Sequence, residues 1–274
     1  MTTLSDNAAV AGNRNVAMVS DGLTSIEVVV QGEGPVIVML PSRGRDSLDY
    51  DEVAQGLAQL GYTVLRPQPR GIGKSVGKLD GLTLHDFAAD IAMVIRQFSK
   101  EPCIIVGHAF GNWVARMTAV DYPQLVRGVV IAAAGASKFP AILSQYVTRS
   151  ADMSLPQAER LEYLKKTFFA PGSDPTVWLD GWHQEAAKSQ RSAADSTRQE
   201  EWWSGGVAPL LDLQAECDPF KPVEYRFELK EQFGDRITIA TVPDASHALL
   251  PEQPQKVVVA IADWLAMLER QNSK

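Results

Sequence analysis

The sequence contains little cysteine, no long apolar run and no basic tract. Cys103 and Cys217 are its only cysteines, which excludes a disulfide framework and a cysteine-based metal knuckle. No apolar run approaches the roughly 18 residues that a membrane-spanning helix needs. Because the net charge is −7 and basic residues are dispersed, nucleic acid is not an expected partner. The four histidines are scattered and form no metal motif, so we expect no metal and no organic cofactor.

The size of the chain allows one large domain. It has 274 residues, 45% of them hydrophobic, which suffices for one α/β core with or without a lid. Residues 1–15 are polar and lack the charged-then-apolar pattern of a secretory signal. We therefore expect a cytoplasmic protein that acts on a small molecule and does not bind a membrane. An exposed helix could also serve as the face of a homodimer.

Apolar runs alternate with amphipathic segments along the first half of the chain. Strands are predicted at residues 26–30, 36–40, 62–66, 103–106 and 126–134, with helices at 49–60, 83–98 and 112–121 between them. Uninterrupted apolar runs are typical of strands buried on both faces. Their alternation with helices predicts an α/β protein with a doubly wound, mostly parallel sheet.

Residues 137–206 show no strand pattern. Short helices are predicted at 156–169 and 175–190, strands resume at 210–214 and 237–242, and further helices are predicted at 222–233 and 254–268. A stretch of this length exceeds an ordinary loop. We therefore predict a helical cap over residues 137–206, inserted into a core formed by residues 1–136 and 207–274.

Gly107 and Gly111 bracket a turn between an apolar run and a helical pattern. Strand, Gly-bounded turn and helix form the setting of a nucleophile elbow, G-x-S-x-G. The central residue here is Ala109, whose methyl group cannot attack a carbonyl carbon. The setting of a nucleophile is therefore present without the nucleophile.

Four motifs in order resemble the α/β-hydrolase superfamily, over about residues 26–268. Residues 69–75 resemble the family's D-x-R-G-x-G-x-S turn, with Gln68 in place of the acidic residue, and the elbow follows. The resemblance places the triad acid at Asp218 and the triad histidine at His247, in the family's order. It also implies the family's fold, with a helical cap. One further departure is Pro41-Ser42, where the family carries His-Gly in its oxyanion loop.

The resemblance assigns roles to two groups of residues. His247 would be a general base oriented by Asp218, although a plain surface histidine is the alternative and Glu216 is a competing acid. The backbone N–H groups of Arg43 and Phe110 would form the oxyanion hole, because Phe110 opens a helix. The Arg43 side chain either holds an anionic group or lies in solvent.

An aromatic pocket is a further expectation. An aromatic lining would favour a partly apolar ligand, but tryptophans of a cap can equally form its core, and His108 can pack beneath the turn. Ser42 could supply a hydroxyl, but it is not on an elbow. The candidate substrate-binding residues are Ser42, His108, Trp178, Trp182, His183 and Trp203.

Three accounts of Ala109 remain open. It could be an engineered replacement of serine in a trapping variant. It could be native, with His247 activating water or removing a substrate proton. The fold could also bind a ligand without turnover. A silent binder has no need of a paired His and Asp, so we expect an enzyme that hydrolyses a small, partly apolar ester, lactone or related carbonyl compound. A lyase or isomerase with His247 as base is the second reading.

Overall fold

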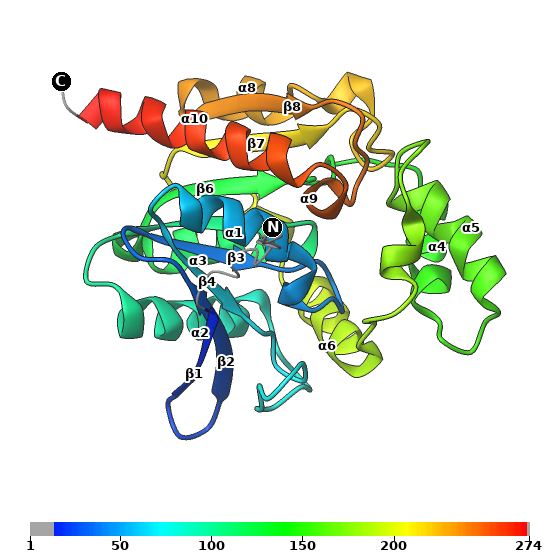
Figure 1. Cartoon of the computed structure of the whole chain (residues 1–274), viewed down its shortest axis with the longest axis horizontal. Helices are drawn as coiled ribbons and strands as arrows, with labels where there is room; N and C mark the ends of the chain where they lie inside the picture. Colours follow the sequence, from blue (N-terminus) through cyan, green and yellow to red (C-terminus); the bar gives the residue numbers. More distant parts are fainter. Residues whose placement is uncertain (1–13, 273–274) are drawn as a thin grey trace, which may run out of the picture.

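A single twisted sheet of eight strands lies at the centre of the molecule (Figure 1). The computed structural model describes residues 14–272, so the polar segment 1–13 lies outside the described residues. The strand order is β1-β2-β4-β3-β5-β6-β7-β8, and β3 to β8 run parallel. The strands are β1 (Arg14–Ser20), β2 (Ser25–Gln31), β3 (Val36–Leu40), β4 (Thr63–Pro67), β5 (Cys103–His108), β6 (Val126–Ala132), β7 (Leu210–Ala215) and β8 (Ile237–Val242).

The predicted doubly wound, mostly parallel sheet is confirmed, with one strand missed. β1 pairs antiparallel with β2 from Arg14 opposite Gln31 to Ser20 opposite Ser25, and forms the sheet edge. Val16 and Met18 on β1 are exposed. Val19 is the one buried residue of β1, and apolar side chains stand on both faces of the strand, so no clear apolar alternation marks it.

Successive side chains of the central strands enter two different cores. Ile37 and Met39 of β3 pack on one face of the sheet, and Val38 and Leu40 pack on the other. This alternation follows from the period of two along a strand, and it explains why both faces need helices.

Helices cover both faces of the sheet (Figure 1). One layer consists of α1 (Asp51–Gln59), α9 (Leu249–Glu252) and α10 (Pro254–Asn272). The other consists of α2 (Leu84–Phe98), α3 (Phe110–Asp121) and α8 (Glu228–Phe233). A capping box formed by Thr83 and Asp86 begins α2. Short 3-10 turns are η1 (Ser47–Tyr50), η2 (Pro123–Leu125), η3 (Pro175–Trp178), η4 (Val223–Tyr225) and η5 (Gly234–Arg236).

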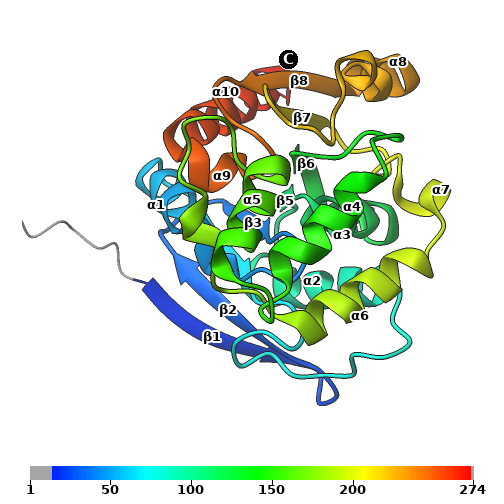
Figure 2. The same ribbon diagram turned by 90° about the vertical axis from the view of Figure 1, so that its right-hand side faces the viewer.

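The segment between β6 and β7 consists of short helices joined by turns. It contains α4 (Ile142–Ala151), α5 (Gln157–Thr167), η3, α6 (Gln184–Asp195) and α7 (Gln199–Trp202). Figure 2 shows α4, α5 and α6 lying in front of the sheet, over the carboxyl ends of its parallel strands. At this edge of a parallel sheet, loops from many strands meet and ligands bind.

Two predicted helices are divided in the structure. The helix expected at 175–190 is split into η3 and α6, because Gly181 takes a φ of +79° between them. The helix expected at 222–233 consists of η4 and α8. Within the described residues, no helix is both long and apolar enough to cross a membrane.

Candidate active site

The turn between β5 and α3 has the geometry of an elbow. Ala109 has φ +48° and ψ −113°, in a region that L residues rarely adopt. A Cβ on Gly107 would collide with the backbone of Gly111, and a Cβ on Gly111 would collide with the carbonyl of Leu40. The two glycines are therefore required by the close approach of strand and helix, and Ala109 stands at the apex.

His247 and Asp218 form a hydrogen-bonded pair. The His247 Nδ1 atom lies 2.9 Å and 3.1 Å from the two carboxylate oxygens of Asp218, and both residues are buried. Because an ionised carboxylate only accepts, Nδ1 carries the proton and Nε2 is left as an acceptor. The competing acid Glu216 instead accepts the backbone N–H of Asp244.

Hydrogen bonds join the two loops that carry this pair. The Cys217 N–H donates to the carbonyl of Ala245 at 2.8 Å. The Ser246 hydroxyl donates to the carbonyl of Cys217, and the Ser246 N–H donates to Glu252. The loops after β7 and β8 therefore hold Asp218 and His247 in a common frame.

Aromatic rings surround the His247 imidazole. Its centroid lies 4.3 Å from that of Phe220 and 5.7 Å from that of Phe168. The Phe168 carbonyl also accepts the Ala248 N–H at 2.7 Å. Neither phenylalanine was predicted. Phe220 could have been suspected, because it follows Asp218 by two residues, whereas Phe168 is brought there only by the fold.

His108 links three loops instead of facing a ligand. Its Nε2 atom lies 2.6 Å from the His247 carbonyl oxygen, and its Nδ1 atom lies 2.7 Å from the Tyr50 hydroxyl. Complete burial, and then the neighbouring His247, lower the pKa of His108 to about 3, so the ring is neutral. A carbonyl only accepts, so Nε2 carries the proton and Nδ1 accepts from Tyr50.

The same chain of hydrogen bonds ends at Ser42. The Tyr50 hydroxyl accepts the Ser42 N–H at 2.9 Å, and Ser42 is buried. Both ring nitrogens of His108 are occupied. These residues form a relay of hydrogen bonds, Ser42–Tyr50–His108–His247, beneath the site. Because the bond at Ser42 uses its backbone N–H, the predicted substrate contact of the Ser42 side chain stays a prediction, whereas both ring nitrogens of His108 bind protein groups.

The backbone N–H groups of Arg43 and Phe110 have no hydrogen-bond partner among residues 14–272, whereas the neighbouring Gly44 N–H donates to the Gln190 side chain at 2.7 Å. Phe110 is the first residue of α3, where the helix leaves N–H groups free at the positive end of its dipole. These are the two donors predicted for an oxyanion hole.

Arg45 occupies the aromatic cluster that was expected to bind substrate. Its guanidinium lies 4.8 Å from the Trp178 ring and 4.7 Å from the Trp182 ring, and it pairs with Asp49 at 2.7 Å. The His183 N–H donates to the Gly44 carbonyl. Trp178 is buried. It and Arg45 therefore connect the loop after β3 (residues 41–46, the first loop) to the helical segment between β6 and β7. Arg45 was not singled out in the sequence.

Trp203 does not contact the His247–Asp218 pair. Its indole N–H donates to Gln232, and its ring packs against Arg116 and Trp202 beside α3. The predicted substrate contact of Trp203 therefore has no support in its position. Trp182 does line a cavity, and His183 borders the first loop.

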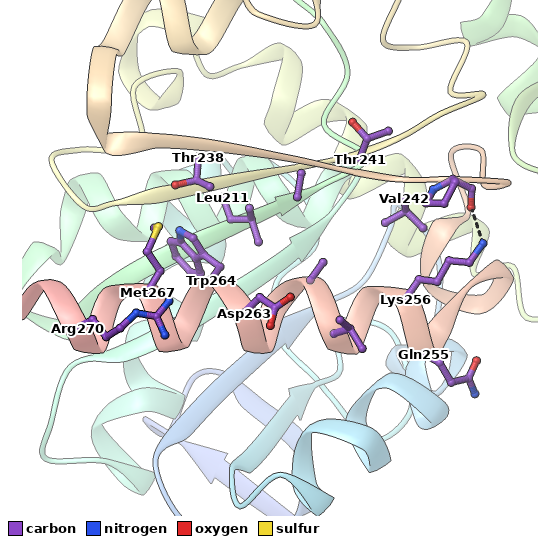
Figure 3. A pocket seen from close by; sticks show the side chains of 14 residues that line it. Leu211, Thr238, Thr241, Val242, Gln255, Lys256, Asp263, Trp264, Met267 and Arg270 are labelled. Carbon is purple, nitrogen blue, oxygen red and sulfur yellow. Dashed lines mark hydrogen bonds between the residues drawn. The ribbon is translucent and has the colours of Figure 1, made fainter.

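A large cleft opens between α4 and α6. Its volume is about 1290 Å³, and its lining includes Arg43, Trp182, Tyr146 and Tyr163. A second groove of about 750 Å³ lies between β8 and α10 (Figure 3), and none of the predicted site residues line it. Within residues 14–272, no cluster of His, Cys, Asp and Glu side chains could hold a metal ion.

Comparison with known proteins identifies the family of this chain. The model of the alpha/beta hydrolase family matches residues 37–261. The chain is 30% identical to 2-(acetamidomethylene)succinate hydrolase of Mesorhizobium japonicum over 109 residues, which cover 40% of this chain and only 39% of that relative.

Solved structures resemble nearly the whole chain. An esterase from Exiguobacterium antarcticum has a TM-score of 0.76 at 17% identity, over 92% of this chain and 99% of that chain. A bromoperoxidase from Bacillus anthracis has a TM-score of 0.76 at 18% identity, over 92% and 100% of the respective chains. These likenesses confirm the predicted fold. Together with the match over residues 37–261, they show that the chain belongs to the α/β-hydrolase family.

Proposed function

We propose that this protein hydrolyses a small, partly apolar ester, lactone or related carbonyl compound by direct attack of water. The hydrogen bond between His247 Nδ1 and Asp218 carries this proposal. It fixes the tautomer that leaves Nε2 free to accept a proton, which is the state a general base requires. The hydrolase name of the Mesorhizobium relative agrees with this reaction class.

The water molecule takes the place of a serine hydroxyl. His108, the residue before Ala109, lies with its ring 5.8 Å from that of His247, so the elbow and the base are neighbours. The Ala109 methyl group leaves room for a water beside it. This water donates one proton to His247 Nε2 while its oxygen bonds to the carbonyl carbon.

The remaining groups stabilise the charges that develop. The carbonyl oxygen becomes an oxyanion that accepts from the N–H groups of Arg43 and Phe110. Asp218 stabilises the imidazolium without taking its proton. His247 then donates that proton to the leaving oxygen as the carbon–oxygen bond breaks, which releases an acid and an alcohol. Helices α4 to α6 act as a cap that limits access of bulk water.

The test is a hydrolysis assay on a panel of p-nitrophenyl esters, thioesters and lactones. We expect turnover by the wild type, and a loss of about 10²- to 10⁴-fold in kcat/KM for His247→Ala. His85→Ala removes a half-exposed histidine that pairs with Asp121 and Glu201, away from the Asp218 pair, and is the matched control. Unchanged turnover in His247→Ala would contradict the proposal.

A covalent probe separates direct attack by water from attack by a protein nucleophile. A fluorophosphonate should leave the wild type unlabelled and should label Ala109→Ser, because that change restores a hydroxyl at the elbow. Labelling of Ser42 in the wild type would exclude direct attack by water. Proton exchange into a bound carbonyl compound without hydrolysis would instead support the lyase or isomerase reading, and tight binding without any reaction would support a binding protein.

A further inference from the structure

Arg43 differs from the buried arginines in having no hydrogen-bond or ion-pair partner among residues 14–272. Its side chain makes no ion pair and no hydrogen bond with any residue in 14–272, although it is only partly exposed. Burial, and then the charge of Arg191, lower the pKa of its guanidinium. Carboxylates pair with three of the buried guanidinium groups: Arg45 with Asp49, Arg66 with Asp51 and Arg70 with Asp90. The other two donate to neutral oxygens, Arg116 to the Asn112 side chain and Arg160 to backbone carbonyls. Desolvating a cation without a partner is costly, so a ligand that supplies the missing anion would be strongly favoured.

The other cations of the cleft between α4 and α6 are already neutralised. Lys188 pairs with Glu185, Arg191 with Asp195 and Arg149 with Glu159. Among the described cations that line the cleft, Arg43 is therefore the one with no carboxylate within ion-pair distance, although the charge of Asp195 acts on it. A single planar guanidinium matches one carboxylate through two parallel hydrogen bonds, whereas a phosphate would call for more than one free cation.

The position of Arg43 relates this charge to the reaction site. Its backbone N–H is one of the two unpaired donors proposed to hold the oxyanion, and its side chain lines the cleft. An acyl compound with its carbonyl oxygen at that N–H could extend its far end along the Arg43 side chain. Aromatic rings of Trp182, Tyr146 and Tyr163 line the same cleft and offer apolar contact to the carbon chain between the two ends.

We propose that Arg43 binds a carboxylate of the substrate, which makes the substrate an anionic acyl compound such as a half-ester of a short dicarboxylic acid. This inference rests on the proposed function, but its test does not depend on turnover. The probe is glutarate, which carries two carboxylates on a short chain, with the neutral glutaramide and inorganic phosphate as comparison ligands.

The experiment is isothermal titration of the full chain with each probe. We expect glutarate to bind the wild type and glutaramide to bind more weakly. Arg43→Gln should raise the Kd of glutarate by about 10- to 100-fold, the range of a charge-assisted hydrogen-bonded pair. Arg43→Lys should give an intermediate Kd, because lysine keeps the positive charge but cannot form the two parallel hydrogen bonds of a guanidinium group. The matched control is Lys165→Gln, which removes the same charge from α5 outside the cleft lining.

A thermal melt accompanies the titration. Because Arg43 has no protein partner, Arg43→Gln should keep or raise the Tm, so weaker glutarate binding in that variant would not reflect misfolding. No glutarate binding to the wild type, or equal Kd values for the wild type and Arg43→Gln, would overturn the proposal. Tighter binding of phosphate than of glutarate would overturn the carboxylate assignment.

A hydrolysis assay on the same variants separates a failure of the proposed reaction from a failure of the proposed carboxylate site. His247→Ala should lose hydrolysis and retain glutarate binding, because the base and Arg43 are different groups. If the ester panel shows no hydrolysis while Arg43 still governs glutarate binding, the proposed reaction fails and the anion site stands. If hydrolysis depends on His247 while glutarate does not bind, the anion site fails and the reaction stands.

Discussion

The Nε2–H group of His108 donates to the carbonyl oxygen of His247 across 2.6 Å. The residue before the elbow therefore holds the loop that carries the proposed base, from below and out of contact with solvent. Through Tyr50, the same ring reaches the Ser42 N–H in the first loop. The geometry of three loops thus depends on one neutral imidazole, and this dependence can be tested.

Tyr50→Phe removes the hydroxyl in the middle of this relay. The Ser42 N–H and the His108 Nδ1 atom both lose their buried partner, so we expect the free energy of unfolding to fall by about 2 to 3 kcal/mol. Urea denaturation measures this loss. Tyr62→Phe is the control, because the Tyr62 hydroxyl makes no hydrogen bond within residues 14–272, and it should change stability little. Equal effects of the two changes would refute the relay.

His108 should make stability fall in acid. Its pKa is about 3 in the folded protein against an ordinary value of 6.5, so below pH 6.5 the unfolded chain binds a proton that the folded chain does not. Stability from this residue is therefore lost as pH falls from 6.5 towards 3, by on the order of 1.4 kcal/mol per pH unit.

The variant His108→Gln isolates this contribution to the pH dependence. Glutamine can accept from Tyr50 and donate to His247 but does not titrate. Urea denaturation at pH 8, 6 and 5 should show a shallower decline for His108→Gln than for the wild type, with pH 8 as the baseline. Parallel declines would show that His108 is not the buried neutral group described above.

Arg45→Met should destabilise the contact between the first loop and the helical segment. The change leaves Asp49 without its partner in a mostly buried position, and we expect a loss of about 2 to 4 kcal/mol. Arg191→Met is a closely matched control, because Arg191 and Asp195 have the same spacing and the same 2.7 Å distance but are exposed. That variant should lose less than about 1 kcal/mol. Thermal unfolding monitored by tryptophan fluorescence reports both.

Ala109→Gly should stabilise the protein. The Ala109 backbone, with φ +48° and ψ −113°, costs an L residue about 1 to 3 kcal/mol, while the added flexibility of glycine in the unfolded chain costs about 0.4 to 1 kcal/mol. We expect a net gain of about 1 kcal/mol in denaturant unfolding. Ala115→Gly, in the regular part of α3, should lose about 1 kcal/mol. A loss at Ala109 of the same size would mean that this turn is not strained.

The elements with a local pattern could be predicted from the sequence. The buried strands show continuous apolar runs, and the elbow shows its two glycines. The order of Ala109, Asp218 and His247 indicated which residues the structure would assemble, and the His247–Asp218 hydrogen bond is present. Each of these signals lies within a few consecutive residues or follows from family resemblance.

The contacts that were missed join residues far apart in sequence. Tyr50 lies 58 residues from His108, and His108 lies 139 residues from His247, so no local pattern marks their hydrogen bonds. Arg45 is a similar case, because its partners Trp178 and Trp182 come from the helical segment. The aromatic residues were recognised, but their position relative to an arginine depends on tertiary packing.

The elbow alanine also has a genetic consequence. Every alanine codon becomes a serine codon through one change at its first base. A point mutation at Ala109 would therefore install a hydroxyl on a backbone that already has the strained conformation, beside an imidazole that is already oriented. On the proposed mechanism, one base change in the gene would therefore replace direct attack by water with attack by a protein hydroxyl.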